Sequence, residues 1–154
     1  MKIEKVGRGT KIARTGAKVQ YGALCYRIRN HKLQVLLITT RGSGRWLIPK
    51  GWPIAKLDKS ETAAQEAYEE AGVTGKVGSR KIGEFDHIAG PVGALSRRRI
   101  VVFPLKVKKT LEHFPEAGQR RRKWFSQAKA AKRVENPELA QLIREFTPKG
   151  IRKQ

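Results

Sequence analysis

The sequence has little cysteine, few acidic residues and no long hydrophobic run. Cys25 is the single cysteine among 154 residues, so no internal disulfide can form, and a cytoplasmic location is expected. No apolar run approaches the roughly 20 residues that a membrane span needs, and residues 1–5 lack the apolar centre of a signal peptide. The histidines at 31, 87 and 113 match no zinc-binding spacing. A disulfide scaffold, a membrane-spanning protein and a zinc module are therefore not expected.

Positive charge is abundant. The chain has 34 Lys and Arg against 13 Asp and Glu, a formal net charge of +21. This excess predicts a polyanionic partner, which charge alone does not identify. A small polyanionic phosphate compound is favoured, nucleic acid less so, and the oligomeric state is left open. Residues 1–16 are expected to form a basic arm, 17–147 one domain, and 148–154 a basic tail.

A helix is predicted over residues 59–71. Asp58 can cap its first turn, and Glu61 stands three residues later, which is a capping-box pattern. Gly72 follows at the position where helices commonly end in a left-handed residue. Ahead of the helix, residues 46–53 predict a short apolar strand that runs into a turn rich in Pro and Gly.

Three of the 13 acidic residues, Glu66, Glu69 and Glu70, lie within five positions of this helix. Glu66 and Glu70 are four residues apart and therefore sit almost above one another. Like charges at this spacing weaken an isolated helix by about 0.2–0.5 kcal/mol, unless a cation neutralises them. Carboxylate oxygens directed at one point suit a hard divalent cation such as Mg²⁺. A solvated acidic face is the alternative.

The remaining pattern predicts an α/β fold. Strands before and after a central helix, followed by helices at the end of the chain, are typical of an α/β/α sandwich with a central mixed β-sheet. Strands are expected at 19–29, 33–40, 46–48, 100–107 and 122–125, with one or two short strands in 75–88, and helices at 126–133 and 137–146.

The region around the acidic cluster resembles the Nudix box. Gly51 is followed fourteen residues later by Gln65-Glu-Ala-Tyr-Glu-Glu-Ala-Gly-Val73, which fits the spacing of that box from end to end. Two positions depart from it. Leu57 stands where the box has a Glu, and Gln65 stands where it has an Arg. Residues 17–146 are similar to the diphosphoinositol polyphosphate phosphohydrolase branch of the superfamily, and that resemblance implies the same α/β/α sandwich.

The resemblance implies a Mg²⁺-dependent pyrophosphohydrolase, with Mn²⁺ as the alternative ion. Glu66, Glu69 and Glu70 would be the catalytic and metal-binding residues. The backbone carbonyl of Lys50 would be a further metal ligand, because the family supplies one from this turn. Glu116 is a candidate for an additional acid from a late loop, and a plain surface role is the alternative.

Basic residues near the box are expected to bind the phosphates. The expected substrate is a diphosphoinositol polyphosphate or a dinucleoside polyphosphate, cleaved at a phosphoanhydride bond. The alternatives are removal of diphosphate from RNA 5′ ends, or a polyanion- or nucleic-acid-binding module with a decayed site. The predicted substrate-binding residues are Arg41, Arg45, Lys50, Arg97, Arg99 and Arg122.

Overall fold

The computed structural model describes residues 17–148. The predicted basic arm (1–16), and all but the first residue of the predicted tail, lie outside this range. The described part contains eight strands and three helices. These are β1 (Lys18–Arg29), β2 (Lys32–Thr39), β3 (Trp46–Leu47), β4 (Lys50–Gly51), α1 (Lys59–Ala71), β5 (Val73–Val77), β6 (Gly83–Ala89), β7 (Ser96–Thr110), β8 (Arg122–Ser126), α2 (Gln127–Arg133) and α3 (Pro137–Glu145).

The strands form one mixed sheet built around β1. β1 pairs in parallel with β7 and antiparallel with β2 and β4. β2 also pairs with β3 and β8, and β7 pairs with β5 and β6. A tight turn at Asn30 and His31, both with positive φ, joins β1 to β2. The predicted mixed sheet is confirmed.

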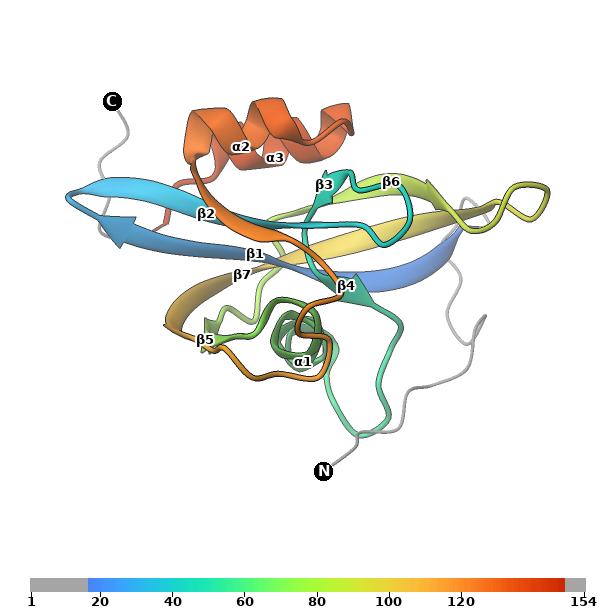
Figure 1. Ribbon diagram of the computed structural model, residues 1–154, viewed down its shortest axis with the longest axis horizontal. Helices are drawn as coiled ribbons and strands as arrows, with labels where there is room; N and C mark the ends of the chain where they lie inside the picture. The colour runs from blue at the N-terminus through green and yellow to red at the C-terminus, as the bar shows by residue number, and fades with distance from the viewer. Residues whose placement is uncertain (1–16, 149–154) are drawn as a thin grey trace.

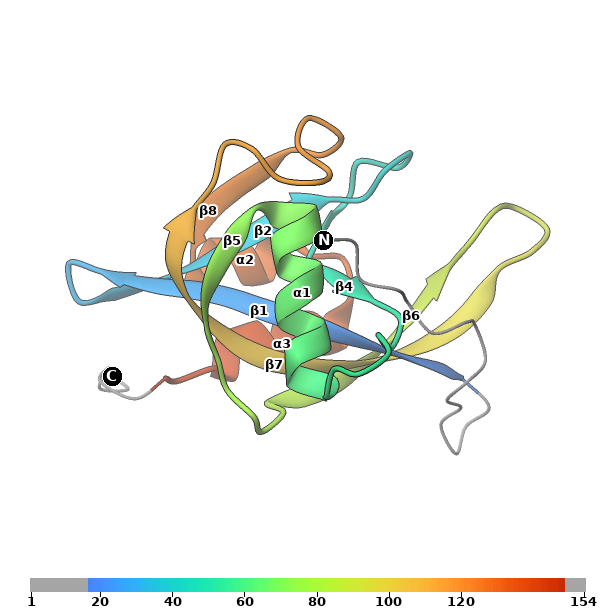
Figure 2. The same cartoon turned by 90° about the horizontal axis from the view of Figure 1, so that it is seen from below.

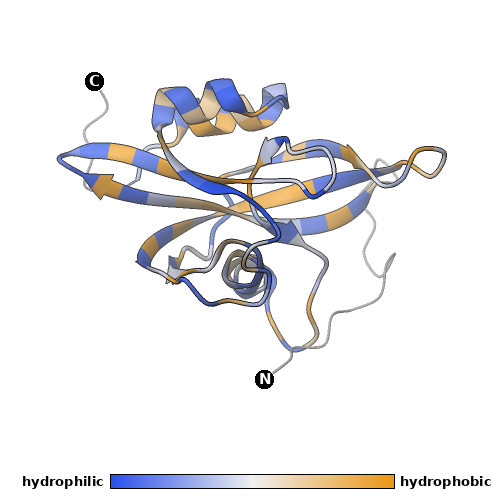
Figure 3. Cartoon of the chain, in the orientation of Figure 1, coloured by the Kyte–Doolittle hydropathy of each residue, from blue (hydrophilic) through white to orange (hydrophobic). Residues whose placement is uncertain are grey.

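Helices cover both faces of the sheet. Figure 1 shows α2 and α3 above it and α1 below it, and Figure 2 shows α1 crossing the sheet from the other side. Alanines 63, 67 and 71 of α1 pack on β1, β2 and β7, while the apolar side of α3 packs on the opposite face. Figure 3 shows that α3 turns its apolar residues toward the sheet. The α/β/α sandwich is therefore confirmed.

The ends of α1 match the prediction. Asp58 accepts a hydrogen bond from the Glu61 backbone at 2.8 Å, and the Glu61 carboxylate accepts one from the Asp58 backbone at 3.0 Å. Gly72 ends the helix with φ 65°. A short strand, β4, forms at the Lys50–Gly51 turn, where none was predicted. Pairing partners lengthen β7 beyond the predicted 100–107, because β6 pairs with its first half and β5 with its second.

Candidate active site

The backbone of β4 lies directly against the Glu66 side chain. Glu66 is fully buried. A Cβ atom placed on Gly51 would lie 1.9 Å from Oε1 of Glu66. Only glycine therefore allows the strand to approach this carboxylate so closely. The spacing between Gly51 and Glu66 in the sequence thus has a steric reason in the fold.

Glu70 is the second buried carboxylate, with an exposed fraction of 8%. Its Oε1 accepts a hydrogen bond from the Lys50 backbone N–H at 3.4 Å and lies 3.8 Å from Nη2 of Arg120. Burial, and then the charge of Glu66, raise the pKa of Glu70 to about 8, against the opposing effect of Arg120 and Lys50. A carboxyl group with this pKa can hold a proton near neutral pH.

The loop between β7 and β8 brings Arg120 and Glu116 to α1. The Glu116 backbone N–H donates to the Glu69 carbonyl at 3.0 Å, which fixes the loop to the helix. Arg120 donates to Glu116 Oε1 at 3.1 Å and to the Thr39 carbonyl at 3.4 Å. Glu116 therefore orients a guanidinium group that faces Glu70. Arg120 belongs to the basic run seen in the sequence, but Arg122 was the residue predicted to bind substrate.

Gln65 contacts the third carboxylate of the helix. Its Nε2 donates to Glu69 Oε2 at 2.9 Å, one turn further along α1. Glu69 is partly exposed, unlike Glu66 and Glu70. Leu57, the other departure from the box, lies with Gln65 along a separate hollow of about 360 Å³ outside α1. Leu57 therefore supplies apolar lining where the family has a carboxylate.

Lys50 extends the site toward β6 and β7. Burial lowers the pKa of Lys50 to about 8, against the charge of Glu70, which raises it. The Arg98 guanidinium lies 5.0 Å from the ring centroid of Trp52, and its charge also lowers the Lys50 pKa. Burial, together with the charges of Lys50 and Arg98, lowers the pKa of His87 to about 4. His87 is therefore neutral at pH 7.

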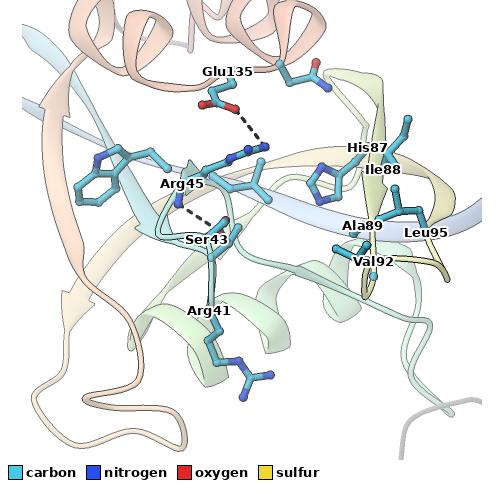
Figure 4. Close-up of a pocket in the computed structure, with 14 residues that line it drawn as sticks. Arg41, Ser43, Arg45, His87, Ile88, Ala89, Val92, Leu95 and Glu135 are labelled. Carbon is cyan, nitrogen blue, oxygen red and sulfur yellow. Dashed lines mark hydrogen bonds and ion pairs between the residues drawn. The ribbon is translucent and has the colours of Figure 1, made fainter.

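A large cavity adjoins these residues. It has a volume of about 610 Å³, which lies within the usual range for ligand pockets. Figure 4 shows His87, Ile88 and Val92 on one side and Ser43 and Arg45 on the other. Arg45 is held by an ion pair with Glu135 at 3.3 Å. A smaller hollow that contains Lys50, Glu70 and Arg120 shares Thr40 and Leu47 with this cavity.

The structure brings only part of the predicted set together. Arg41 borders the cavity, but its guanidinium donates to Gln119 and points away from His87 and Leu95 (Figure 4). Arg97 pairs with Asp86, and Arg99 pairs with Glu84, Asp86 and Glu138.

The Arg122 side chain is also engaged elsewhere, because its hydrogen bonds go to backbone carbonyls. It donates to the carbonyls of Ala71, Gly72 and Leu111. Arg98, which is between Arg97 and Arg99 and points to the opposite side of the strand, is the residue that acts on Lys50. The signal that could have identified Arg98 is strand alternation, but the sequence does not tell which side faces the site.

Two carboxylates of this site are suited to bind a divalent cation. Glu66 and Glu70 are buried together, and each raises the cost of charge on the other, which a cation would relieve. Within residues 17–148, no three side chains of His, Cys, Asp or Glu are arranged to hold a metal ion. The backbone N–H of Lys50, whose carbonyl is the further ligand predicted from the sequence, donates to Glu70.

Comparison with known proteins agrees with this geometry. The model of the NUDIX domain matches residues 18–148. The chain is 31% identical over 157 residues to "Nudix hydrolase 21, chloroplastic" of Arabidopsis thaliana, covering 94% of this chain and 74% of that protein. It is 32% identical over 119 residues to human "Diphosphoinositol polyphosphate phosphohydrolase 3-alpha", covering 76% of this chain and 69% of that one. The chain belongs to the Nudix hydrolase family.

Solved structures share the fold. A Caenorhabditis elegans Ap4A hydrolase in a binary complex aligns with a TM-score of 0.61 at 22% identity, covering 83% of this chain and 93% of that one. The Nudix domain of Shewanella oneidensis NrtR with ADP-ribose aligns with a TM-score of 0.57 at 16% identity, covering 82% of this chain and 86% of that one. Among the described helices, none is long and apolar enough to cross a membrane.

Proposed function

We propose that this protein is a Mg²⁺-dependent pyrophosphohydrolase that cleaves a phosphoanhydride bond in a highly anionic substrate. The observation that carries the proposal is the buried pair Glu66 and Glu70, with Glu70 flanked by Lys50 and Arg120 in a small hollow that borders the large cavity. A divalent cation bound to these carboxylates would neutralise charge on the phosphate oxygens. A cytoplasmic location is part of the proposal, supported by the single, buried Cys25.

The chain's own residues supply the remaining functions. Arg120, held by Glu116, and Lys50 offer positive charge where the phosphates would lie. Burial, and then the charge of Glu66, raise the pKa of Glu70 to about 8, so a bound cation would be what keeps this carboxylate charged near pH 7. His87 stays neutral and presents a hydrogen-bonding edge to the cavity.

Two substrate classes are proposed, as in the relatives whose names include diphosphoinositol polyphosphate or Ap4A. Ile88, Val92 and Leu95 form an exposed apolar wall of the cavity. A nucleobase can bury its ring face against such a wall, which favours binding. A diphosphoinositol polyphosphate has no apolar ring face of comparable size. This wall favours a dinucleoside polyphosphate over the inositol compound.

A substrate panel tests the proposal. Phosphate release is measured with Mg²⁺, with Mn²⁺ and with EDTA, for a dinucleoside tetraphosphate, a diphosphoinositol polyphosphate and a 5′-triphosphorylated RNA. Metal-dependent hydrolysis of the first compound, at the highest kcat/KM, is expected. Binding of all three compounds without hydrolysis under any condition would instead identify a binding module with a decayed site.

The Glu70→Gln variant is the sharper test. It keeps the shape of the side chain but removes a charged ligand, so kcat should fall at least a hundredfold. Glu145→Gln, an exposed change at the end of α3, should leave kcat within twofold. Circular dichroism checks the fold of both variants. Wild-type turnover by Glu70→Gln at saturating Mg²⁺ would rule out the site as drawn.

A further inference from the structure

A second cluster of positive charge lies at the end of the β1–β2 hairpin. It consists of Arg27, Arg29 and Lys32, which we call the hairpin patch. Arg29 and Lys32 are exposed and directly opposite one another in the antiparallel register. Arg27 is two residues before Arg29 and points to the same face. Figure 2 shows that this end of the hairpin projects beyond α1, away from β4.

The patch is on the face of the sheet that carries α1. Ala23 and Cys25, which alternate with Arg27 along β1, pack with Ala67 of α1. The helix does not reach the hairpin end (Figures 1 and 2), and Arg29 and Lys32 are exposed there. The patch is therefore a surface separate from the Glu66–Glu70 site.

Arg27 is fixed in place. Its Nε donates to Gln34 Oε1 at 2.7 Å, and its guanidinium lies 4.0 Å from the ring centroid of Trp124. Burial, and then the charge of Arg29, lower the Arg27 pKa. A guanidinium held over an indole presents a planar, charged platform, and Arg27 is partly exposed.

Among the described residues, no carboxylate forms an ion pair with Arg27, Arg29 or Lys32 of the hairpin patch. Like charges directly opposite one another in a sheet are destabilising, so the Arg29–Lys32 pair costs folding energy. A bound anion would remove that cost.

We propose that the hairpin patch binds a single-stranded nucleic acid. Arg29 and Lys32 contact successive phosphates, and an unpaired base stacks on the Arg27 guanidinium above Trp124. A duplex hides its bases and cannot use the platform. An anionic membrane or an acidic peptide would use the charges but gives no role to a flat guanidinium held on an indole. The net charge of +21 supplies the long-range attraction.

Fluorescence anisotropy with labelled ten-nucleotide probes tests the proposal on the full chain. RNA and DNA single strands, a duplex of the same sequence and anionic phospholipid vesicles are compared. The patch variant Arg27→Gln/Arg29→Gln/Lys32→Gln should weaken single-strand binding at least tenfold. The slope of log K against log salt should fall by about 1.4, near 0.7 for each of the two lost phosphate contacts.

A matched variant separates the patch from general charge. Lys59→Gln/Lys129→Gln/Lys132→Gln removes the same charge from exposed helix positions and should weaken binding less than threefold. Arg27→Lys keeps the positive charge but removes the planar guanidinium group. It should therefore weaken single-strand binding more than duplex binding. Equal losses in the two triple variants, or equally tight, patch-dependent binding of duplex or vesicles, would overturn the proposal. Hydrolysis of the small substrate should be unchanged in the patch variant.

Discussion

Individual side chains at this site take their properties from their neighbours. Glu70 and Lys50 are buried beside one another, and burial moves the pKa of each toward about 8 from opposite directions. Gln65 occupies the place of the usual arginine, yet it still reaches a carboxylate through its amide. Gln65 therefore holds Glu69 with one hydrogen bond, where an Arg could make two.

Gln65→Arg should keep or raise activity. Arg can donate two charge-assisted hydrogen bonds to Glu69, which Gln65 now contacts through one. We expect kcat/KM between one and ten times the wild-type value, measured by phosphate release at saturating Mg²⁺. Gln65→Ala should lower it, because Glu69 loses the hydrogen bond from the Gln65 amide. A severe loss in Gln65→Arg, with an intact circular dichroism spectrum, would show that the site is built around Gln65.

His87 should make the protein less stable in mild acid. Its pKa is lowered to about 4 in the folded state, against about 6.5 in the unfolded chain. As pH falls below 6.5, His87 becomes protonated in the unfolded chain but stays neutral in the folded protein. The free energy of unfolding therefore decreases.

Urea unfolding at pH 7 and pH 5 measures this effect. His87→Gln should reduce the pH-dependent part of the free energy of unfolding, while His31→Gln, an exposed change in a turn, should leave it unchanged. Glu70 contributes with the opposite sign, because a raised acid pKa loses stability as pH rises between 4.5 and 8. The effect of His87 is therefore read from the difference between variants. Identical pH dependence in all three proteins would contradict it.

Among the elements, α1 was the most predictable from sequence. Asp58, Glu61 and Gly72 set its ends through local hydrogen bonds and a left-handed residue, which the sequence shows directly. The choice between Arg97, Arg98 and Arg99 could not be made in this way. Alternation along β7 is visible in the sequence, but which side faces the site depends on the pairing with β1 and β6.

Arg122 should act on stability and not on substrate binding. It donates to the carbonyls of Ala71, Gly72 and Leu111, and so ties the end of α1 to the loop that follows β7. Arg122→Gln should lower the free energy of unfolding by about 1–3 kcal/mol. KM, measured well below the Tm, should stay within twofold. Arg121→Gln, at an exposed neighbour, is the control. A tenfold rise in KM for Arg122→Gln would restore the predicted substrate role.

In the whole molecule, the site is assembled from segments that are far apart in the sequence. The hollow at Glu70 takes Lys50 from β4, Thr40 from the end of β2 and Arg120 from the loop before β8. The box predicted Glu66 and Glu70, because they are close in sequence. Arg120 and the large cavity depend on how the loops meet, which only the fold determines.

The last prediction separates local phosphate binding from the overall charge. Lys50→Ala/Arg98→Ala should raise KM at least tenfold for a tetraphosphate substrate and about threefold for a diphosphate, because a longer chain uses more contacts. Lys149→Ala/Lys153→Ala, the same charge change outside the described residues, should act mainly at low salt, where charges reach beyond the roughly 10 Å screening length of 0.1 M salt. The comparison is kcat/KM at 20 and 200 mM salt. If both variants lose equally and salt removes both losses, the +21 charge acts as a diffuse field, and Lys50 and Arg98 do not bind the phosphates.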